Sequence, residues 1–129
     1  MQLDQNRMIV LPSHEFFESL LKPRGNRPNQ DWSETHTYDP YVIVCFYADW
    51  CGPCKKLDKK FLVDCTPKIK WYSCNIDEND TTLGYCGLQS IPSFALIKNG
   101  MFCGRRAGAG AVDELLDWLA ENGFPVSDT

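Results

Sequence analysis

The sequence lacks a long apolar run and an excess of basic charge. Its longest uninterrupted apolar stretch covers residues 41–48. That is far less than the roughly 18–20 residues that span a bilayer, so no membrane-spanning segment is expected. Lys and Arg total 13 against 17 Asp and Glu, which gives a formal net charge of -4 at pH 7. Nucleic acid and membrane surfaces are therefore not among the expected partners.

No secretory signal is expected at the N-terminus. Residues 1–7 are polar and contain no apolar segment ahead of a small-residue cleavage site. Asp4 beside a lone arginine, Arg7, also differs from the Arg-rich, acid-poor composition of a mitochondrial presequence. The expected location is cytoplasmic, and the alternative is mitochondrial if a presequence has been removed.

The cysteines lack the pattern of a disulfide scaffold or a zinc site. Seven is an odd total, whereas secreted disulfide frameworks normally use even numbers in shorter chains. Only Cys51 and Cys54 are close in sequence, and neither His14 nor His36 stands at a matching spacing for tetrahedral zinc. No metal is expected. The other cysteines are interpreted as packing or surface thiols: Cys45, Cys65, Cys74, Cys86 and Cys103.

What is present fits one domain over residues 1–129. Apolar patterns predict strands near 8–11, 41–47, 69–75, 93–98 and 101–106, and helices near 13–22, 53–63, 77–85 and 111–121. Prolines and a glycine punctuate residues 23–40, which are expected to form an inserted surface loop. Asn99-Gly100 predicts a hairpin. This order predicts an α/β fold, with a central mixed β-sheet flanked by helices on both faces.

The candidate chemistry lies where the strand at 41–47 meets the helix that begins at Pro53. Cys51 and Cys54 stand three residues apart there, and two thiols at this spacing can close a small disulfide. The first N–H groups and the positive dipole end of a helix stabilise a thiolate, which is the nucleophile in disulfide exchange. Cys51, on the cap side and open to a partner, is predicted to attack. Cys54, one turn inside, is predicted to resolve the mixed disulfide.

The string Ala48-Asp49-Trp50-Cys51-Gly52-Pro53-Cys54-Lys55 resembles the active site of the thioredoxin family. Further matches lie at Asn75-Ile76-Asp77, Ile91-Pro92, Lys98-Asn99-Gly100 and Gly108, so the resemblance covers about residues 41–123. It implies the thioredoxin fold, with a cis bond before Pro92 that lets a substrate strand lie beside the dithiol. It also implies that the site is shaped, and substrate contacted, by Trp50, Gly52, Pro53, Ile91 and Pro92.

The sequence departs from the family pattern at three places. The family buries an acid paired with a lysine on the next strand where this chain has Cys45 and Ser73, so the usual proton acceptor for the resolving thiol is missing. Lys59 replaces a mid-helix proline, so a weaker kink is expected. The third departure is the length of the loop at 23–40. A lysine cluster is interpreted as a solvated helix face or, alternatively, a docking patch for acidic partners: Lys55, Lys56, Lys59 and Lys60.

The resemblance implies an enzyme, a thiol–disulfide oxidoreductase that reduces protein disulfides and acts in electron transport and cell redox homeostasis. It implies no bound cofactor and electrons from NADPH through a thioredoxin reductase. The expected partners of this monomer are that reductase and disulfide-containing proteins. One alternative is a thioredoxin-fold scaffold module of a larger assembly, with weak redox activity, that works through the loop at 23–40. An oxidase or isomerase is opposed by the Gly52-Pro53 pair and by the missing signal peptide.

Overall fold

The fold is built on a five-stranded sheet with the strand order β1-β3-β2-β4-β5. The computed structural model describes residues 2–23 and 37–127. The strands are β1 (Ile9–Val10), β2 (Tyr41–Tyr47), β3 (Lys70–Asn75), β4 (Ser93–Lys98) and β5 (Met101–Ala107). β1 and β2 pair parallel with β3, whereas β4 pairs antiparallel with β2 and β5. The predicted mixed sheet is confirmed, and the strand at 41–47 lies in its centre.

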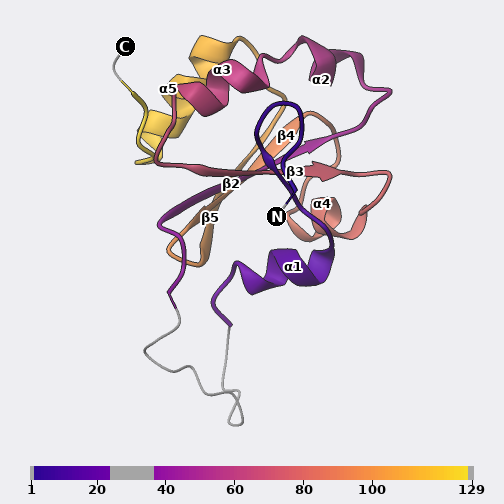
Figure 1. Cartoon of the computed structure of the whole chain (residues 1–129), viewed down its shortest axis with the longest axis vertical. Coiled ribbons are helices and arrows are strands. Elements are labelled where there is room, and N and C mark those ends of the chain that lie inside the picture. The colour runs from indigo at the N-terminus through magenta and orange to yellow at the C-terminus, as the bar shows by residue number, and fades with distance from the viewer. Residues whose placement is uncertain (1, 24–36, 128–129) are drawn as a thin grey trace.

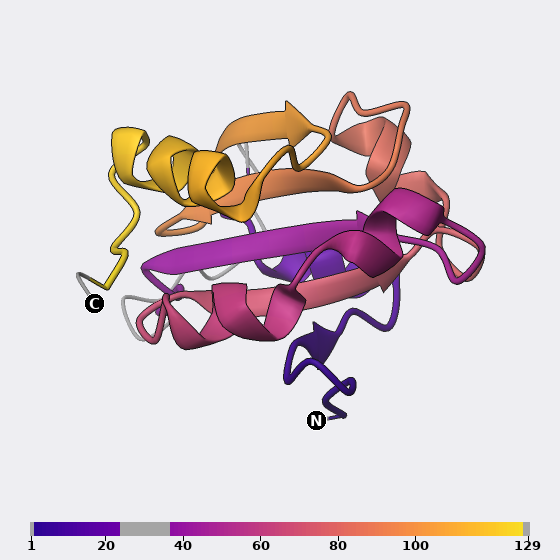
Figure 2. The same cartoon turned by 90° about the horizontal axis from the view of Figure 1, so that it is seen from above.

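Helices cover both faces of this sheet, as the sequence predicts. They are α1 (His14–Ser19), α2 (Gly52–Lys56), α3 (Lys59–Asp64), α4 (Thr81–Tyr85) and α5 (Val112–Glu121). Figures 1 and 2 show α2, α3 and α5 on one face and α1 and α4 on the other. Because β2 is covered on both sides, its residues 42–46 are all buried, which is typical of a central strand. None of the described helices has the length and apolarity to cross a membrane.

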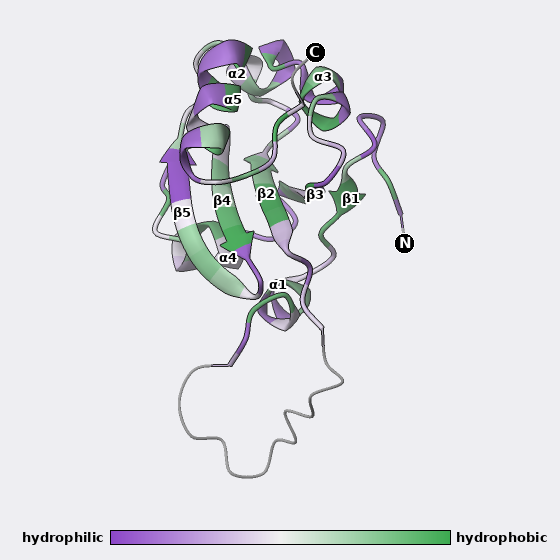
Figure 3. Cartoon of the chain, turned by 90° about the vertical axis from the view of Figure 1, so that its left-hand side faces the viewer, coloured by the Kyte–Doolittle hydropathy of each residue, from purple (hydrophilic) through white to green (hydrophobic). Residues whose placement is uncertain are grey.

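Two apolar clusters fill the space between the layers. Cys45 and Phe94 pack with Leu115 of α5 on one face, and Val44 and Phe46 pack with α1 on the other. The hydropathy colouring of Figure 3 follows this arrangement, since β2 and β4 are largely hydrophobic and β5 turns hydrophilic toward one end. The face occupied by Cys45 is the one beneath α2 and α3, because Cys45 packs in one cluster with Leu57 and Leu62.

Local signals explain most element boundaries. The side chain of Ser13 accepts a hydrogen bond from Phe16 N and caps α1. Asn99 and Gly100 both have positive φ angles, 51° and 81°, as a tight hairpin between β4 and β5 requires. Gly123 has a φ of 78° just after α5 and ends that helix as predicted.

The predicted helix over 53–63 is wrong as one continuous element. α2 ends at Lys56, Leu57 is extended with φ -77° and ψ 123°, and α3 starts at Lys59. Asp58 explains the break, because its side chain accepts a hydrogen bond from Phe61 N at 3.0 Å and caps a new helix. The expected weaker kink is also wrong, since the chain breaks directly before Lys59 without a proline there.

Two further boundaries differ from the sequence prediction. α4 begins at Thr81 instead of residue 77, because the amides of Asp77, Glu78 and Asn79 all bond to Asn75 and form turns. α1 is shorter than the predicted 13–22 and ends at Ser19. Most of the predicted loop at 23–40 lies outside the described residues.

Candidate active site

The site lies at the carboxyl end of the central strand, where β2 leads through residues 48–50 into α2. Cys51 is the N-cap of α2, with an extended backbone at φ -84° and ψ 109°, and its Sγ accepts a hydrogen bond from Cys54 N at 3.2 Å. Pro53 stands in the first turn of the helix, where its missing N–H would lack an intrahelical partner anyway. The sequence therefore places one thiol at the cap and the other inside the first turn.

Cys51 and Cys54 form a disulfide, with their Cα atoms 5.3 Å apart. The Cys51 residue keeps 4% of its surface exposed and Cys54 keeps 2%. The sequence predicted Cys51 to be open to a partner, but both are buried in this disulfide form. They pack together with Ala48 and against Tyr47 and Ile91, so access to Cys51 is limited by its apolar neighbours.

The peptide bond between Ile91 and Pro92 is cis, as the resemblance implied. Ile91 packs against the cluster that holds the disulfide. Pro92 is buried, and its carbonyl accepts a hydrogen bond from Gly108 N at 2.8 Å. The segment before β4 is thereby held next to the dithiol by the end of β5.

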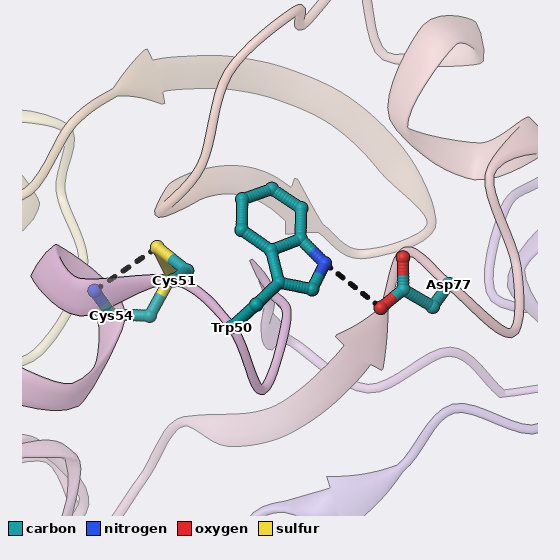
Figure 4. Close-up of a disulfide and its surroundings, with 4 residues drawn as sticks. All are labelled: Trp50, Cys51, Cys54 and Asp77. Carbon is teal, nitrogen blue, oxygen red and sulfur yellow. Dashed lines mark hydrogen bonds between the residues drawn. A yellow bond between two sulfur atoms is a disulfide. The ribbon is translucent and has the colours of Figure 1, made fainter.

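Trp50 borders the site and is 66% exposed. Its indole Nε1 donates a hydrogen bond to Asp77 Oδ2 at 3.0 Å (Figure 4). Asp77 belongs to the segment Asn75-Ile76-Asp77 that resembles the family, but the sequence predicts no function for it. The sequence signal that could have placed Asp77 at the site is its position just after β3. The carboxyl ends of neighbouring parallel strands meet at one edge of a sheet, so Asp77 comes close to the residues that follow β2.

A thiol occupies the core below the disulfide. Cys45 is fully buried, and burial raises its pKa to about 12, while the charge of Lys59 lowers it and that of Asp4 raises it. Its register partner on β3 is Ser73, whose buried Oγ has no hydrogen-bond partner among the described residues. A neutral thiol and a hydroxyl thus stand where the family resemblance implies a buried acid paired with a lysine.

Lys59 departs from the predicted solvated lysine face. It is 9% exposed, and its Nζ lies 4.4 Å from the centre of the Tyr47 ring, which is cation–π geometry. The break before α3 turns this side chain inward. The other members of the cluster are exposed, as expected: Lys55, Lys56 and Lys60.

The remaining thiols and His14 are not part of the apolar cluster that holds the disulfide. Cys74 and Cys86 are buried, Cys65 is half-buried and Cys103 is exposed, which fits packing and surface thiols. Ring nitrogens of His14 lie 2.9 Å from Thr82 Oγ1 and 2.9 Å from Glu18 Oε1. His36 lies outside the described residues. Within the described ranges no group of three His, Cys, Asp or Glu could hold a metal ion.

Comparisons with known proteins agree with this geometry. The family model described as "Thioredoxin" matches residues 28–121. The thioredoxin of Rickettsia conorii is 40% identical over 81 residues, which cover 60% of this chain and 77% of that protein. Thioredoxin-3, mitochondrial, of Saccharomyces cerevisiae is 33% identical over 70 residues, covering 53% of this chain and 55% of that protein.

Solved structures show the same fold. The oxidised form of mitochondrial thioredoxin 3 from Saccharomyces cerevisiae superposes with a TM-score of 0.69 at 24% identity, covering 88% of this chain and 94% of that one. The thioredoxin of Schistosoma mansoni gives a TM-score of 0.67 at 27% identity, covering 90% and 95%. The likeness spans nearly the whole of both neighbours.

Proposed function

The chain belongs to the thioredoxin family, and we propose that it reduces protein disulfides with Cys51 as the attacking thiol and Cys54 as the resolving thiol. Its class is thiol–disulfide oxidoreductase. The observation that carries the proposed roles is the disulfide at the start of α2, with Cys51 at the cap and Cys54 one turn inside. A cap sulfur that accepts a backbone N–H bond is the better placed of the two to be stabilised as a thiolate.

The proposed reaction has two exchanges. The Cys51 thiolate attacks one sulfur of the substrate disulfide, forms a mixed disulfide and releases the other substrate sulfur as a thiolate. Cys54 then loses its proton and attacks Cys51 Sγ, so that the Cys51–Cys54 disulfide forms and the second substrate sulfur leaves as a thiolate. Two electrons pass from the dithiol to the substrate, and the two released thiolates take up protons.

We infer that an extended substrate segment docks across the rim of the site. Trp50 supplies an exposed aromatic surface, fixed by its bond to Asp77. Gly52 and Pro53 are exposed beside Cys51. Ile91 packs against the cluster that holds the disulfide, and we propose that Ile91 and Pro92 contact the substrate segment from there. An exposed indole next to a short turn suits contact with a peptide, because it buries apolar area at little entropic cost.

We further propose that the reducing electrons come from NADPH through a thioredoxin reductase, with no cofactor held by this monomer. Five free thiols in one chain favour a reducing compartment, for which we propose the cytoplasm, with mitochondria as the alternative. The chain is proposed to work as one domain over residues 1–129, with the segment at about 23–40 as an insertion.

A trapping experiment tests the assigned roles. Cys54→Ser should accumulate a mixed disulfide with a native disulfide-containing protein such as insulin. In this variant Cys51 can attack the substrate disulfide, but no second thiol resolves the adduct. Cys51→Ser should form no adduct, and Cys103→Ser, which removes an exposed thiol away from the site, should turn over as the parent does. An adduct mapped by mass spectrometry to any cysteine other than Cys51 would refute the proposal.

A further inference from the structure

A hollow of about 610 Å³ adjoins the resolving thiol. Cys54 lines it together with Tyr47, Asp49, Lys59 and, from the N-terminal segment, Asp4. Its volume accommodates several water molecules, and its lining offers them polar partners. The hollow therefore connects Cys54 to charged side chains from parts of the chain that are far apart in sequence.

The N-terminal segment holds Asp4 in a fixed position at this hollow. Asp4 Oδ1 accepts hydrogen bonds from Asn6 N at 2.8 Å and from Met8 N at 3.0 Å. Oδ2 of Asp4 accepts no hydrogen bond from any of the described residues. Arg7 of the same segment forms an ion pair with Asp64 at the end of α3. Asp4 is thus a half-buried carboxylate with one oxygen anchored and the other left for exchange with water.

The charges around the hollow act on the buried Cys45 and on the half-buried Tyr47. Burial is the main cause that raises the pKa of Cys45 and of the half-buried Tyr47; the Asp4 carboxylate raises both further, and Lys59 lowers that of Cys45. Asp49 also raises the pKa of Tyr47, but its side chain is exposed. Asp4 is therefore the carboxylate whose charge reaches the core below the disulfide. The charged and titratable groups that surround this place are Asp4, Cys45, Tyr47, Asp49, Lys55, Lys59 and Glu78.

We propose that Asp4 accepts the proton of Cys54 when the mixed disulfide is resolved, across the water that the hollow can hold. This proposal rests on the proposed function. Asp4 takes the part that a buried acid at the position of Cys45 would otherwise play, and it comes from the N-terminal segment instead of from β2. Lys59 lies on the same hollow, and its positive charge favours the thiolate form of Cys54.

Cys54 Sγ–H gives its proton through water to the Asp4 carboxylate, and the resulting Cys54 thiolate attacks Cys51 Sγ. The bond between Cys51 and the substrate sulfur breaks, the substrate leaves as a thiolate, and the Cys51–Cys54 disulfide forms. Asp4 then returns its proton to solvent, where the departing thiolate takes one up.

The test uses an aromatic disulfide whose two thiolates absorb visibly, dithiobis(nitrobenzoate), in stopped flow. Attack by Cys51 releases the first thiolate and resolution by Cys54 releases the second, so the two steps give separate phases. The background carries Cys65→Ser and Cys103→Ser, because the other free thiols are buried. Asp4→Asn is the test variant, since its amide oxygen can still accept both backbone hydrogen bonds. Asp49→Asn is the matched control from the same hollow.

The expected result is an unchanged first phase and a second phase slowed about tenfold at about pH 7 in Asp4→Asn. The deficit should disappear at about pH 10, where hydroxide removes the thiol proton directly. A second phase equal to the parent's, a deficit that does not depend on pH, or a deficit in Asp49→Asn instead would each overturn the assignment of Asp4 while the proposed function stands. Loss of the first phase in the parent would overturn both.

Discussion

Replacing Cys45 by aspartate should speed release of the mixed disulfide and lower the stability of the fold. The change puts a carboxylate on the face of β2 beneath α2 and α3, where the residue is fully buried. Burial raises the pKa of the Cys45 thiol to about 12, so this thiol is protonated near neutral pH and cannot accept a proton. A carboxylate at this place can accept one without the water path to Asp4 that the parent is proposed to use. The resolving step should therefore accelerate near neutral pH, and Cys45→Asp should also rescue Asp4→Asn.

The structural setting gives the size of the stability loss. Burial of this depth raises a carboxyl pKa by about 3 units, which at about 1.4 kcal/mol for each unit costs about 4 kcal/mol when the group is ionised. Ser73 is the register partner of Cys45, and its Oγ has no partner among the described residues. A hydrogen bond from this hydroxyl to the new carboxylate returns about 2 kcal/mol. The net loss of about 2 kcal/mol lowers Tm by roughly 8 °C.

Urea unfolding of the reduced protein checks this value, with Cys45→Asn as the uncharged control of the same shape. The buried carboxyl has a higher pKa in the folded state than in the unfolded state. It costs no stability at a pH below the unfolded-state pKa, and stability is lost as pH rises through the folded-state pKa. The difference between the Asp and Asn variants should therefore be absent at about pH 3 and grow toward neutral pH. If the two variants are equally stable at every pH, or if release is no faster than in the parent, the reasoning fails.

Three further outcomes are expected. In the reduced protein, iodoacetamide should alkylate Cys51 before the buried Cys86, and the reverse order in a mass map would contradict the assigned roles. Burial raises the pKa of Cys86 from 9.0 to about 12, so the free energy of unfolding should fall as pH rises between these two values. Cys86→Ala removes this thiol, so its free energy of unfolding should fall less steeply than that of the control variant Cys65→Ala. Gly100→Ala should destabilise the fold by about 1–2 kcal/mol, because φ is positive and a Cβ would lie 2.8 Å from side-chain atoms of Lys22 and Tyr38. A Cβ at Gly84 would meet open space, so Gly84→Ala should not destabilise the fold. Equal melting temperatures for the two alanine variants would refute this last prediction.

The sequence predicts the elements whose signals are local. The buried run of β2, the Asn99-Gly100 turn and the glycine after α5 are each specified by a few neighbouring residues, and the structure has them where expected. The prediction of one continuous helix over 53–63 is wrong, because Asp58 lies in a lysine-rich stretch whose composition is typical of a helix. Only its capping bond to Phe61 N distinguishes a break from a continuous helix, and composition alone does not record that bond.

The candidate site divides in the same way. Cys51, Cys54 and the Ile91-Pro92 segment carry sequence patterns that are specific at short range. The burial of Lys59 and the approach of Asp4 to the hollow depend on how α3 and the N-terminal segment pack against β2. Such contacts join residues that are far apart in sequence, and a single sequence contains no signal for them.

The two edges of the sheet have a consequence for self-association. An edge strand with free backbone groups can template the strand of another molecule. Here β1 is only two residues long, and the register of β4 with β5 shifts between Leu96 and Ile97, so that β5 carries a bulge next to two arginines, Arg105 and Arg106. Short, kinked and charged edges resist edge-to-edge pairing. The apolar strands β2 and β4 therefore stay enclosed, and aggregation through growth of the sheet is disfavoured at either end.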